Sequence, residues 1–248
     1  MMNCKKLILM TLAVATMSLQ SCLSDNAGDV PRLYANAVVT VKHMGKTHSF
    51  FQLDAKTTLY PVNVNSILYN GKEVRALINY TKVDSSAHGF SKAVVVNGID
   101  SIRTKDIVQL APGQRIETLG NDPIEIVDDW VTISEDGYLT LRVRAIWGNL
   151  GHKHRLNLVA GINPNNPHEV ELRHDAGGDR RGVPLDALIA FRLYKYFPVE
   201  GAKDYKLTVK WKGFNGKMKE ATFTITAPAT LPFNSVDKKL LHTGARIN

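Results

Sequence analysis

Histidines provide the first candidates for chemistry in this sequence. His152 and His154 are two positions apart, so a strand would direct both side chains to the same face, and His174 follows further along the chain. Neutral imidazole is a common zinc ligand, and Asp175 or Glu171 could add a carboxylate to such a site. These residue types make a metal centre the first function to consider.

The neighbours of these histidines favour a structural role instead. His154 is in phase with Leu156, and His174 is in phase with Leu172, so both imidazoles lie on apolar strand faces. Glu171 points to the opposite face from His174. We therefore expect a hydrogen-bonded histidine pair in the core or at its rim, and we expect no metal and no other cofactor.

The sequence lacks the common catalytic motifs. It has no G-x-S-x-G nucleophile motif, and Asp128 and Asp129, as neighbours in a strand, would point to opposite faces and could not flank one glycosidic bond. The segment Asp175–Asp179 contains two glycines but lacks the lysine of a phosphate-binding loop and the spacing of an EF-hand, which favours a simple turn. The sequence thus predicts a protein that is not an enzyme, with an unrecognised hydrolase as the catalytic alternative.

Lysines on one predicted strand form a candidate binding surface. Lys206, Lys210 and Lys212 share a face, and Lys217 and Lys219 could extend this cationic ridge. The chain carries a formal net charge of +8, so the ridge could bind anionic lipid A, an acidic glycan or an acidic protein. The alternative is a solvated face whose charges prevent the pairing of strand edges.

The N-terminus has the composition of a secretory signal. Residues 1–21 combine two lysines with an apolar stretch at 7–19, which is shorter than the roughly 20 residues of a membrane-spanning helix. Leu19–Cys22 resembles the lipobox of bacterial lipoproteins, so Cys22 is the expected site of lipidation and residues 22–34 form a flexible tether. The sequence therefore predicts attachment to a membrane through a lipid.

The residues around the lipobox bear on location and on disulfides. Similarity to lipoprotein sorting rules implies the outer membrane, because Leu23 stands where an aspartate would signal retention in the inner membrane. Asp25 and Asp29 form only a reduced acidic cluster, which leaves open whether the protein faces the periplasm or the exterior. Cys4 leaves with the signal and Cys22 carries lipid, so no disulfide is expected.

Alternation of polar and apolar residues dominates the mature chain. The full sequence of 248 residues is 44% hydrophobic and 22% charged, which is typical of a globular protein and excludes a disordered or fibrous one. The chain is expected to be all-β, in two blocks separated by the turn clusters at 111–113 and 120–123, with a tail at 228–248. Strands of the first block are expected at 37–44, 47–53, 59–64, 73–83, 90–102 and 104–110. Strands of the second block are expected at 130–134, 138–147, 155–160, 169–174, 188–196, 205–214 and 217–226.

Turn residues indicate hairpins in the second block. Glu135–Gly137 would connect the strands at 130–134 and 138–147, and Asn215–Gly216 suits a type I′ turn in the last hairpin. The odd-numbered residues from Leu139 to Trp147 share one apolar face. Seven or so antiparallel strands of this length are typical of a β-sandwich.

Three segments resemble the NigD-like lipoproteins of Gram-negative anaerobes: Asp129–Ile133, Gly137–Arg142 and Glu171–Asp179. The resemblance implies an N-terminal OB-type β-barrel over residues 35–118, followed by a C-terminal antiparallel β-sandwich over residues 122–227. The family takes its name from a gene in a bacteriocin operon, and the resemblance implies a role in self-immunity.

An OB-type barrel also suggests a binding face. Such barrels often bind oligonucleotides or oligosaccharides, although nucleic acid is not an expected partner outside the cytoplasm. The aromatic candidates in the first block are Tyr34, His43, His48, Tyr60, Tyr69, Tyr80 and Phe90. The expected function is non-enzymatic binding of a protein or envelope component, with bacteriocin immunity as the case that the resemblance implies and carbohydrate binding as the alternative.

Overall fold

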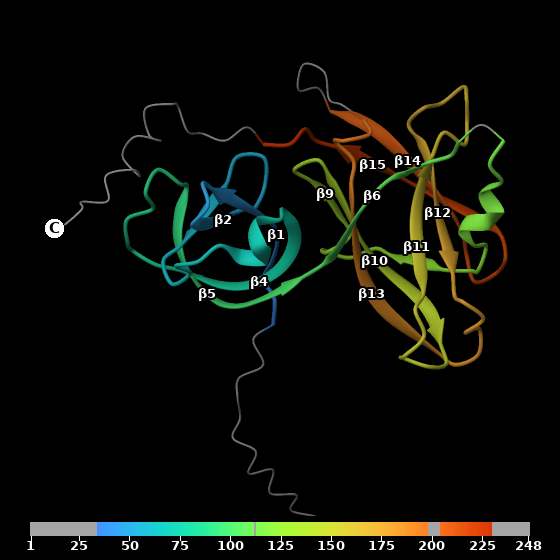
Figure 1. The fold of residues 1–248 in the computed structure, drawn as a ribbon, viewed down its shortest axis with the longest axis horizontal. Helices are drawn as coiled ribbons and strands as arrows, with labels where there is room; N and C mark the ends of the chain where they lie inside the picture. Colours follow the sequence, from blue (N-terminus) through green and yellow to red (C-terminus); the bar gives the residue numbers. More distant parts are fainter. Residues whose placement is uncertain (1–33, 112, 198–203, 230–248) are drawn as a thin grey trace, which may run out of the picture. The chain divides into compact units, whose positions relative to one another are not determined.

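The computed structural model describes residues 34–111, 113–197 and 204–229. Within these ranges the chain forms strands and two short 3-10 helices, η1 (Leu68–Gly71) and η2 (Ile116–Leu119) (Figure 1). The predicted all-β class is therefore confirmed. The described helices are too short to cross a membrane.

Several predictions concern residues outside these ranges. The secretory signal at 1–21, the lipidation site Cys22, nearly all of the tether at 22–34 and most of the tail at 228–248 lie outside the described residues. They stay predictions from the sequence.

The first block folds into a closed barrel. Its strands are β1 (Ala37–Met44), β2 (His48–Gln52), β3 (Thr58–Pro61), β4 (Val74–Lys82) and β5 (Lys92–Ser101). Their order around the barrel is β1-β2-β3-β5-β4, with β4 paired back to β1. β3 and β5 run parallel, whereas the other neighbouring strands run antiparallel. Alternate residues such as Val39, Val41, Leu59 and Ile78 fill the interior, as the period-two pattern requires.

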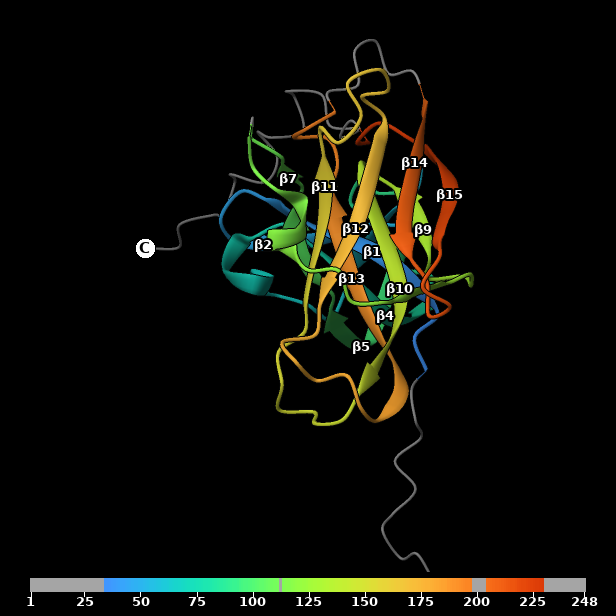
Figure 2. The ribbon, with the colours of Figure 1, turned by 90° about the vertical axis from the view of Figure 1, so that its right-hand side faces the viewer.

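The second block is a sandwich of two sheets. Its strands are β6 (Arg103–Asp106), β7 (Val108–Gln109), β8 (Glu125–Val127), β9 (Ile133–Glu135), β10 (Tyr138–Trp147), β11 (Arg155–Ala160), β12 (Glu169–Asp175), β13 (Val183–Arg192), β14 (Tyr205–Lys212) and β15 (Met218–Ile225). One sheet, here the β10 sheet, has the order β6-β13-β10-β8, with β9 also paired to β10. The other, the β12 sheet, has the order β15-β14-β12-β11-β7 (Figure 2).

The sequence predicted a wholly antiparallel sandwich, but three pairs of its strands run parallel. β6 runs parallel to β13, β7 to β11, and β12 to β14. Parallel neighbours cannot be joined by a tight turn, so they are far apart in the sequence and leave no local signal.

The predicted strand at 104–110 is divided between the two sheets. β6 joins the β10 sheet and β7 joins the β12 sheet, and Ile107 between them packs against the sandwich core. The chain therefore leaves the barrel at Ile102, and the predicted barrel limit at residue 118 is too late. The turn clusters at 111–113 and 120–123 are connections within the sandwich.

The strand phase of the sandwich core agrees with the sequence pattern. Leu139, Leu141, Val143 and Ala145 on β10 are buried together between the sheets, and Trp147 packs against the same cluster. On the opposite face of β10, Tyr138 and Thr140 are also buried, because they contact barrel residues. β10 is thus covered on both faces over its first half.

Polar contacts connect the barrel to the β9–β10 hairpin. The hydroxyl of Tyr138 donates to the carboxylate of Glu73 at 2.6 Å, and Nε of the fully buried Arg75 donates to Oγ1 of Thr140 at 3.2 Å. Lys42 forms an ion pair of 2.8 Å with Asp136 at the hairpin tip. These groups are buried, so their pairing restricts how the two folds can be arranged.

The two predicted hairpin turns differ in geometry. Asp136 and Gly137 both have positive φ, 51° and 74°, as a two-residue type I′ turn requires. The last hairpin instead has a three-residue loop, in which Gly216 alone has positive φ and its N–H donates to the carbonyl of Gly213. The predicted type I′ turn at Asn215–Gly216 is therefore wrong, because the flanking strands pair from Lys212 to Met218 and leave room for a type I turn followed by glycine.

Candidate functional site

A pocket of about 610 Å³ opens at one edge of the sandwich. Its walls come from β6, β10, β11 and β13 and from the loop 148–154. Basic side chains and histidines line it, and the described residues that line it include no Asp or Glu. We name it the basic pocket after these residues: Arg103, Lys105, His152, Lys153, His154 and Arg155.

β6 supplies two of the cations. Arg103 and Lys105 are the register partners of Ile189 and Phe191 on β13, and both partners belong to the sandwich core. Register partners point to the same face of a sheet, so both cations extend into the layer between the sheets. β6 is the edge strand of its sheet, which leaves these side chains at the open side of the sandwich.

Lys105 reaches from β6 across the gap between the two sheets to β11. Its Nζ donates to the carbonyl of Leu156 and, at 2.7 Å, to Oδ1 of Asn157, both on β11 of the other sheet. Neither acceptor is charged, and within the described ranges Lys105, Arg103 and Lys153 form no ion pair. Burial lowers the pKa of Lys105, and the nearby Arg103 lowers it further. The pocket therefore contains a partly desolvated ammonium group without a protein counter-ion.

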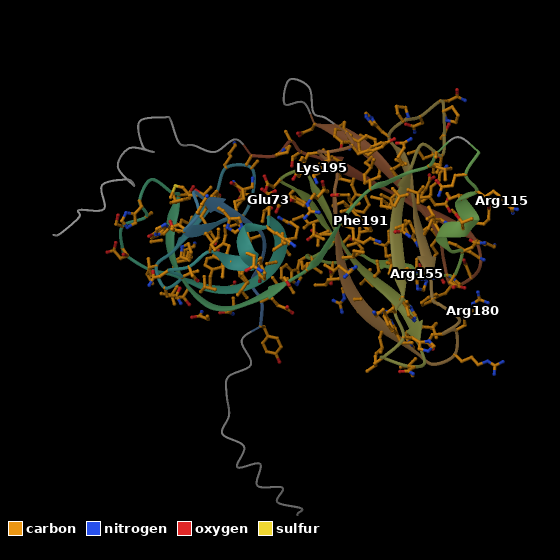
Figure 3. The ribbon with its side chains drawn as sticks, viewed as in Figure 1. Glu73, Arg115, Arg155, Arg180, Phe191 and Lys195 are labelled. Carbon is orange, nitrogen blue, oxygen red and sulfur yellow. The ribbon has the colours of Figure 1, made fainter. Side chains whose placement is uncertain are left out.

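Arg155 differs from the other cations of the pocket. Its guanidinium pairs with the carboxylate of Asp175 at 2.5 Å, on the neighbouring strand β12. Figure 3 labels Arg155 on the sandwich. Its charge is already balanced within the protein.

His154 and Trp147 form the floor of the pocket, and His174 bonds to His154 without lining the pocket. The rings of Trp147 and His154 are stacked, with centroids 3.7 Å apart and an interplanar angle of 14°. Nδ1 of His154 lies 2.9 Å from Nε2 of His174, and Nε2 of His154 lies 3.3 Å from a carboxylate oxygen of Asp179. Nδ1 of His174 lies 3.0 Å from the carbonyl oxygen of Pro123. All four ring nitrogens are therefore engaged.

The partners of these nitrogens fix the positions of the protons. A carbonyl oxygen only accepts, so Nδ1 of His174 carries hydrogen, and burial lowers the pKa of His174, which favours its neutral form. Its Nε2 must then accept from Nδ1 of His154. The backbone N–H of Asn149 lowers the pKa of Asp179, and the contact with His154 lowers it further, so this carboxylate also accepts. Nδ1 of His154 therefore donates to His174, and Nε2 of His154 faces the carboxylate of Asp179 at 3.3 Å.

This arrangement leaves neither imidazole of the His154–His174 pair free to act as a base. Each imidazole is held by two fixed partners, and the stacked Trp147 holds the ring of His154 in place. A general base needs a ring nitrogen that can reach a substrate proton. The floor instead provides a fixed, flat surface beneath a group of cations.

Comparisons with known proteins now identify the family. Residues 38–102 match the NigD-like N-terminal OB domain, and residues 106–225 match the NigD-like C-terminal beta sandwich domain. The chain belongs to the NigD-like family. The first match ends at Ile102, directly after β5 and the barrel, and the second begins at Asp106, the last residue of β6.

Solved structures share this NigD-like fold. A protein of Parabacteroides distasonis described as toxin-related is 25% identical, with a TM-score of 0.62 over 83% of this chain and 96% of that one. A NigD-like immunity protein of Bacteroides caccae is 21% identical, with a TM-score of 0.54 over 77% and 92%. A Bacteroides fragilis protein described as a lipoprotein is 16% identical, with a TM-score of 0.55 over 79% and 98%. No curated protein matches the chain.

The histidines named as candidate metal ligands do not converge in the NigD-like fold. His154 and His174 form the hydrogen-bonded pair that strand phase predicted. His152 is exposed in the loop before β11 and is not joined to them, and Asp175 pairs with Arg155. The described residues contain no group of three or more His, Cys, Asp or Glu that could hold a metal ion.

The predicted cationic ridge is interrupted by carboxylates. Lys210 pairs with Glu169 at 3.0 Å, and its register partners are Glu171 on β12 and Glu220 on β15. Lys212 donates to the carbonyl of Asn121. The ridge is therefore a mixed-charge face, because acidic residues from two neighbouring strands lie between its lysines.

Two further residues of the predicted ridge are not part of that face. Lys219 is the register partner of Trp211, which faces the core, and it pairs with Glu125 at 2.8 Å. Lys217 lies in the loop before β15, and Lys206 remains exposed on the outer face. Strand phase thus divides the lysines that the sequence grouped together.

The aromatic residues of the barrel do not form one binding face. Tyr69 and Tyr80 pack against the barrel core. Tyr60 instead stacks with Phe90 and contacts His88. The others are dispersed: His43 bonds to Ser49 and Lys72, His48 bonds to Thr47, and Tyr34 is exposed.

Sequence reasoning missed Arg103 and Lys105, the two cations that β6 contributes to the pocket. Arg103 and Lys105 fell in a segment assigned to the barrel, and their position depends on a parallel pairing with β13. The available signal was that these two residues are two positions apart, which places both side chains on the same face of a strand. It gains meaning only once the partner strand is known.

Proposed function

We propose that this NigD-like chain is a non-enzymatic envelope lipoprotein that binds its partner at the basic pocket. The observation that supports the site is the pocket of about 610 Å³ on a fixed floor, with Arg103, Lys105 and Lys153 unpaired within the described residues. Its volume lies within the usual range of ligand sites, roughly 300–1,000 Å³. A lipid at Cys22 would hold this site at the outer membrane.

Groups that a hydrolase could use are engaged in structural contacts. Asp129 pairs with Arg142 at 2.6 Å, Asp175 pairs with Arg155, and the ring nitrogens of the histidine pair are occupied. Acyl and glycosyl transfer need a free nucleophile and base or a convergent pair of carboxylates. These contacts support binding over turnover.

Bacteriocin immunity is the special case that the family suggests. One solved relative is described as an immunity protein and another as toxin-related. Immunity by capture requires a specific surface near the membrane and no catalysis. The proposed lipid anchor and the pocket would supply both.

Site-specific cross-linking in cells tests the proposal. A photo-reactive benzophenone amino acid at Leu150, which lines the pocket and is 79% exposed, should capture one envelope partner. The same group at the exposed Thr222, on the outer face of β15 in the other sheet, serves as the control. Capture of the same proteins from both positions, or of none from Leu150, would contradict the proposal.

Carbohydrate binding is a second candidate, supported by Trp130. Its side chain is 55% exposed between two hollows of about 300 and 230 Å³. The preceding Asp129 is fixed, because its carboxylate accepts from the N–H of Val131 and pairs with Arg142. A rigid exposed indole beside polar groups can stack on a sugar ring.

If glycans bind at this second site, binding should require Trp130 and should not require the cations of the basic pocket. In a glycan array, Trp130→Ala should lose all signal and Lys105→Met should keep it. Equal signals from Trp130→Ala and the unmodified protein would remove this candidate.

A further inference from the structure

We infer that the basic pocket binds an oxyanion, a phosphate or carboxylate group attached to an apolar body. This inference names the ligand chemistry of the site proposed above and rests on that proposal. The unpaired cations would hold the anionic group, and the apolar wall of the same pocket would hold the rest of the ligand.

The first support is the imbalance of charge. Arg103, Lys105 and Lys153 line the pocket, and within the described residues none of them has a carboxylate partner. Several other cations of the sandwich are balanced; Arg142, for example, lies 2.6 Å from both Asp129 and Asp186. The pocket is therefore a local concentration of unbalanced positive charge.

The second support is the position of Lys105. Its Nζ is held by two uncharged acceptors on β11 and is already partly desolvated. The free-energy cost of desolvating and ordering this ammonium group has already been incurred on folding. Binding of an anion would therefore not incur it a second time. Arg103, two residues away on the same face of β6, can donate to the same anion.

The third support is the composition of the remaining walls. Val143 and Ile189 belong to the core of the sandwich, Leu156 is partly buried against it, and Leu150 is exposed. Cations on one side and aliphatic groups on the other match a ligand with an anionic head and an apolar body. An anion with no apolar part would use only half of the site.

The test compares four probes below their micelle-forming concentrations: inorganic phosphate, decyl phosphate, decanoate and the neutral decyl maltoside. The chain has three tryptophans, so the indole N–H signal of Trp147 can be followed by NMR with Trp130 and Trp211 as internal references. We expect decyl phosphate and decanoate to shift Trp147 selectively, inorganic phosphate to bind more weakly, and decyl maltoside to have no effect.

Variants assign the binding to the cations. Lys105→Met should weaken decyl phosphate binding by about tenfold or more, because it removes one charge-assisted contact. Lys105→Arg should retain most of the affinity, and Lys206→Met, on the outer face of β14, should bind as the unmodified protein does. Thermal melting of each variant shows whether it is folded.

Two results would overturn the inference. One is equal binding of decyl maltoside and decyl phosphate, and the other is unchanged binding in a folded Arg103→Met/Lys105→Met variant. Specific cross-linking from Leu150 without binding of either anion would refute the oxyanion and leave the proposed site standing. Anion binding without a cross-linked protein would support the oxyanion and refute a protein partner.

Discussion

Lys42 in the barrel and Lys105 in the sandwich are both largely shielded from water, but among the described residues only Lys42 has a carboxylate partner. Lys42 lies 2.8 Å from Asp136, and their side chains are 11% and 1% exposed. Lys105 has two uncharged acceptors and lies at an open pocket. A buried charge is costly unless it is paired, so the charge of Lys42 is balanced on folding and that of Lys105 is not.

The difference separates cations that stabilise this fold from cations that are available to a ligand. Arg144 and Arg142 bind Asp186 from β10 and lower the pKa of its carboxyl to about 2. Lys210 is likewise paired with Glu169. Ion pairs such as these contribute nothing to the formal net charge of +8, which is the excess of basic over acidic residues in the whole chain. The cations near Lys105 that have no carboxylate partner among the described residues are gathered in one pocket.

The largest loss of stability is expected when the buried ion pair between Lys42 and Asp136 is broken. Asp136→Asn keeps a residue that tolerates φ of 51° and an oxygen that can accept from the N–H of Ala229, but it removes the charge opposite Lys42. We expect the free energy of unfolding to fall by about 3–5 kcal/mol. Urea denaturation measures this loss.

The double variant Lys42→Met/Asp136→Asn is the matched control. It should lose less stability than Asp136→Asn alone, because it leaves no uncompensated cation. An Asp136→Asn protein as stable as the unmodified one would mean that Lys42 reaches water and that the comparison with Lys105 is wrong.

A smaller loss of stability is expected when His174, the partner of His154, is replaced. His174→Ala removes the acceptor for Nδ1 of His154 and the donor to the carbonyl of Pro123. Near pH 7.5 we expect a loss of about 1–3 kcal/mol in the free energy of unfolding. Chemical denaturation at that pH provides the measurement.

The loss caused by His174→Ala should also depend on pH. Burial lowers the folded-state pKa of His174 below the ordinary value of 6.5, so the unfolded chain takes up a proton first as the pH falls. Its contribution to stability is therefore complete above about pH 6.5 and declines at lower pH. The two proteins should converge in stability between pH 7.5 and 5.5. Curves that stay parallel, or diverge in acid, would contradict a neutral, buried His174.

Lys105→Met should change stability much less than either substitution above. It removes two hydrogen bonds, but it also removes the cost of an unpaired, partly desolvated charge, so we expect a change within about 1 kcal/mol. Denaturation in the absence and presence of decyl phosphate would separate the effects, since only the unmodified protein should be stabilised by the probe. A loss comparable to that of Asp136→Asn would make Lys105 a structural residue.

Local periodicity was sufficient wherever neighbours in the sequence determine the structure. The strands Ala37–Met44, Tyr138–Trp147 and Arg155–Ala160 have the predicted bounds, and phase placed His154 and His174 on core-facing sides. The NigD-like motifs correctly implied a barrel followed by a sandwich. These features depend on alternation and on turns, which a single sequence displays.

Features that depend on distant partners could not be predicted. The assignment of β6 and β7 to different sheets rests on parallel pairings with β13 and β11, which no turn connects. The charge on Lys210 is offset by Glu169, a residue on β12. A free cation and a paired cation look alike in a sequence, because the distinction lies in what tertiary structure brings within about 4 Å.

The smallest effect is expected on the lysine face of β14, where the comparison is sharpest. Lys210 and Lys105 are both strand lysines, but Lys210 touches Glu169 at 3.0 Å in contact with solvent. An exposed pair contributes little, so Lys210→Met should barely lower stability, and a double-mutant cycle with Glu169→Gln should give a small coupling energy that decreases in high salt. Lys210→Met should also leave decyl phosphate binding unchanged, because its charge is already offset by Glu169. If Lys210→Met weakened anion binding as much as Lys105→Met, paired and unpaired lysines would be equivalent to the ligand, and the site would extend over the whole basic surface rather than lie in the pocket.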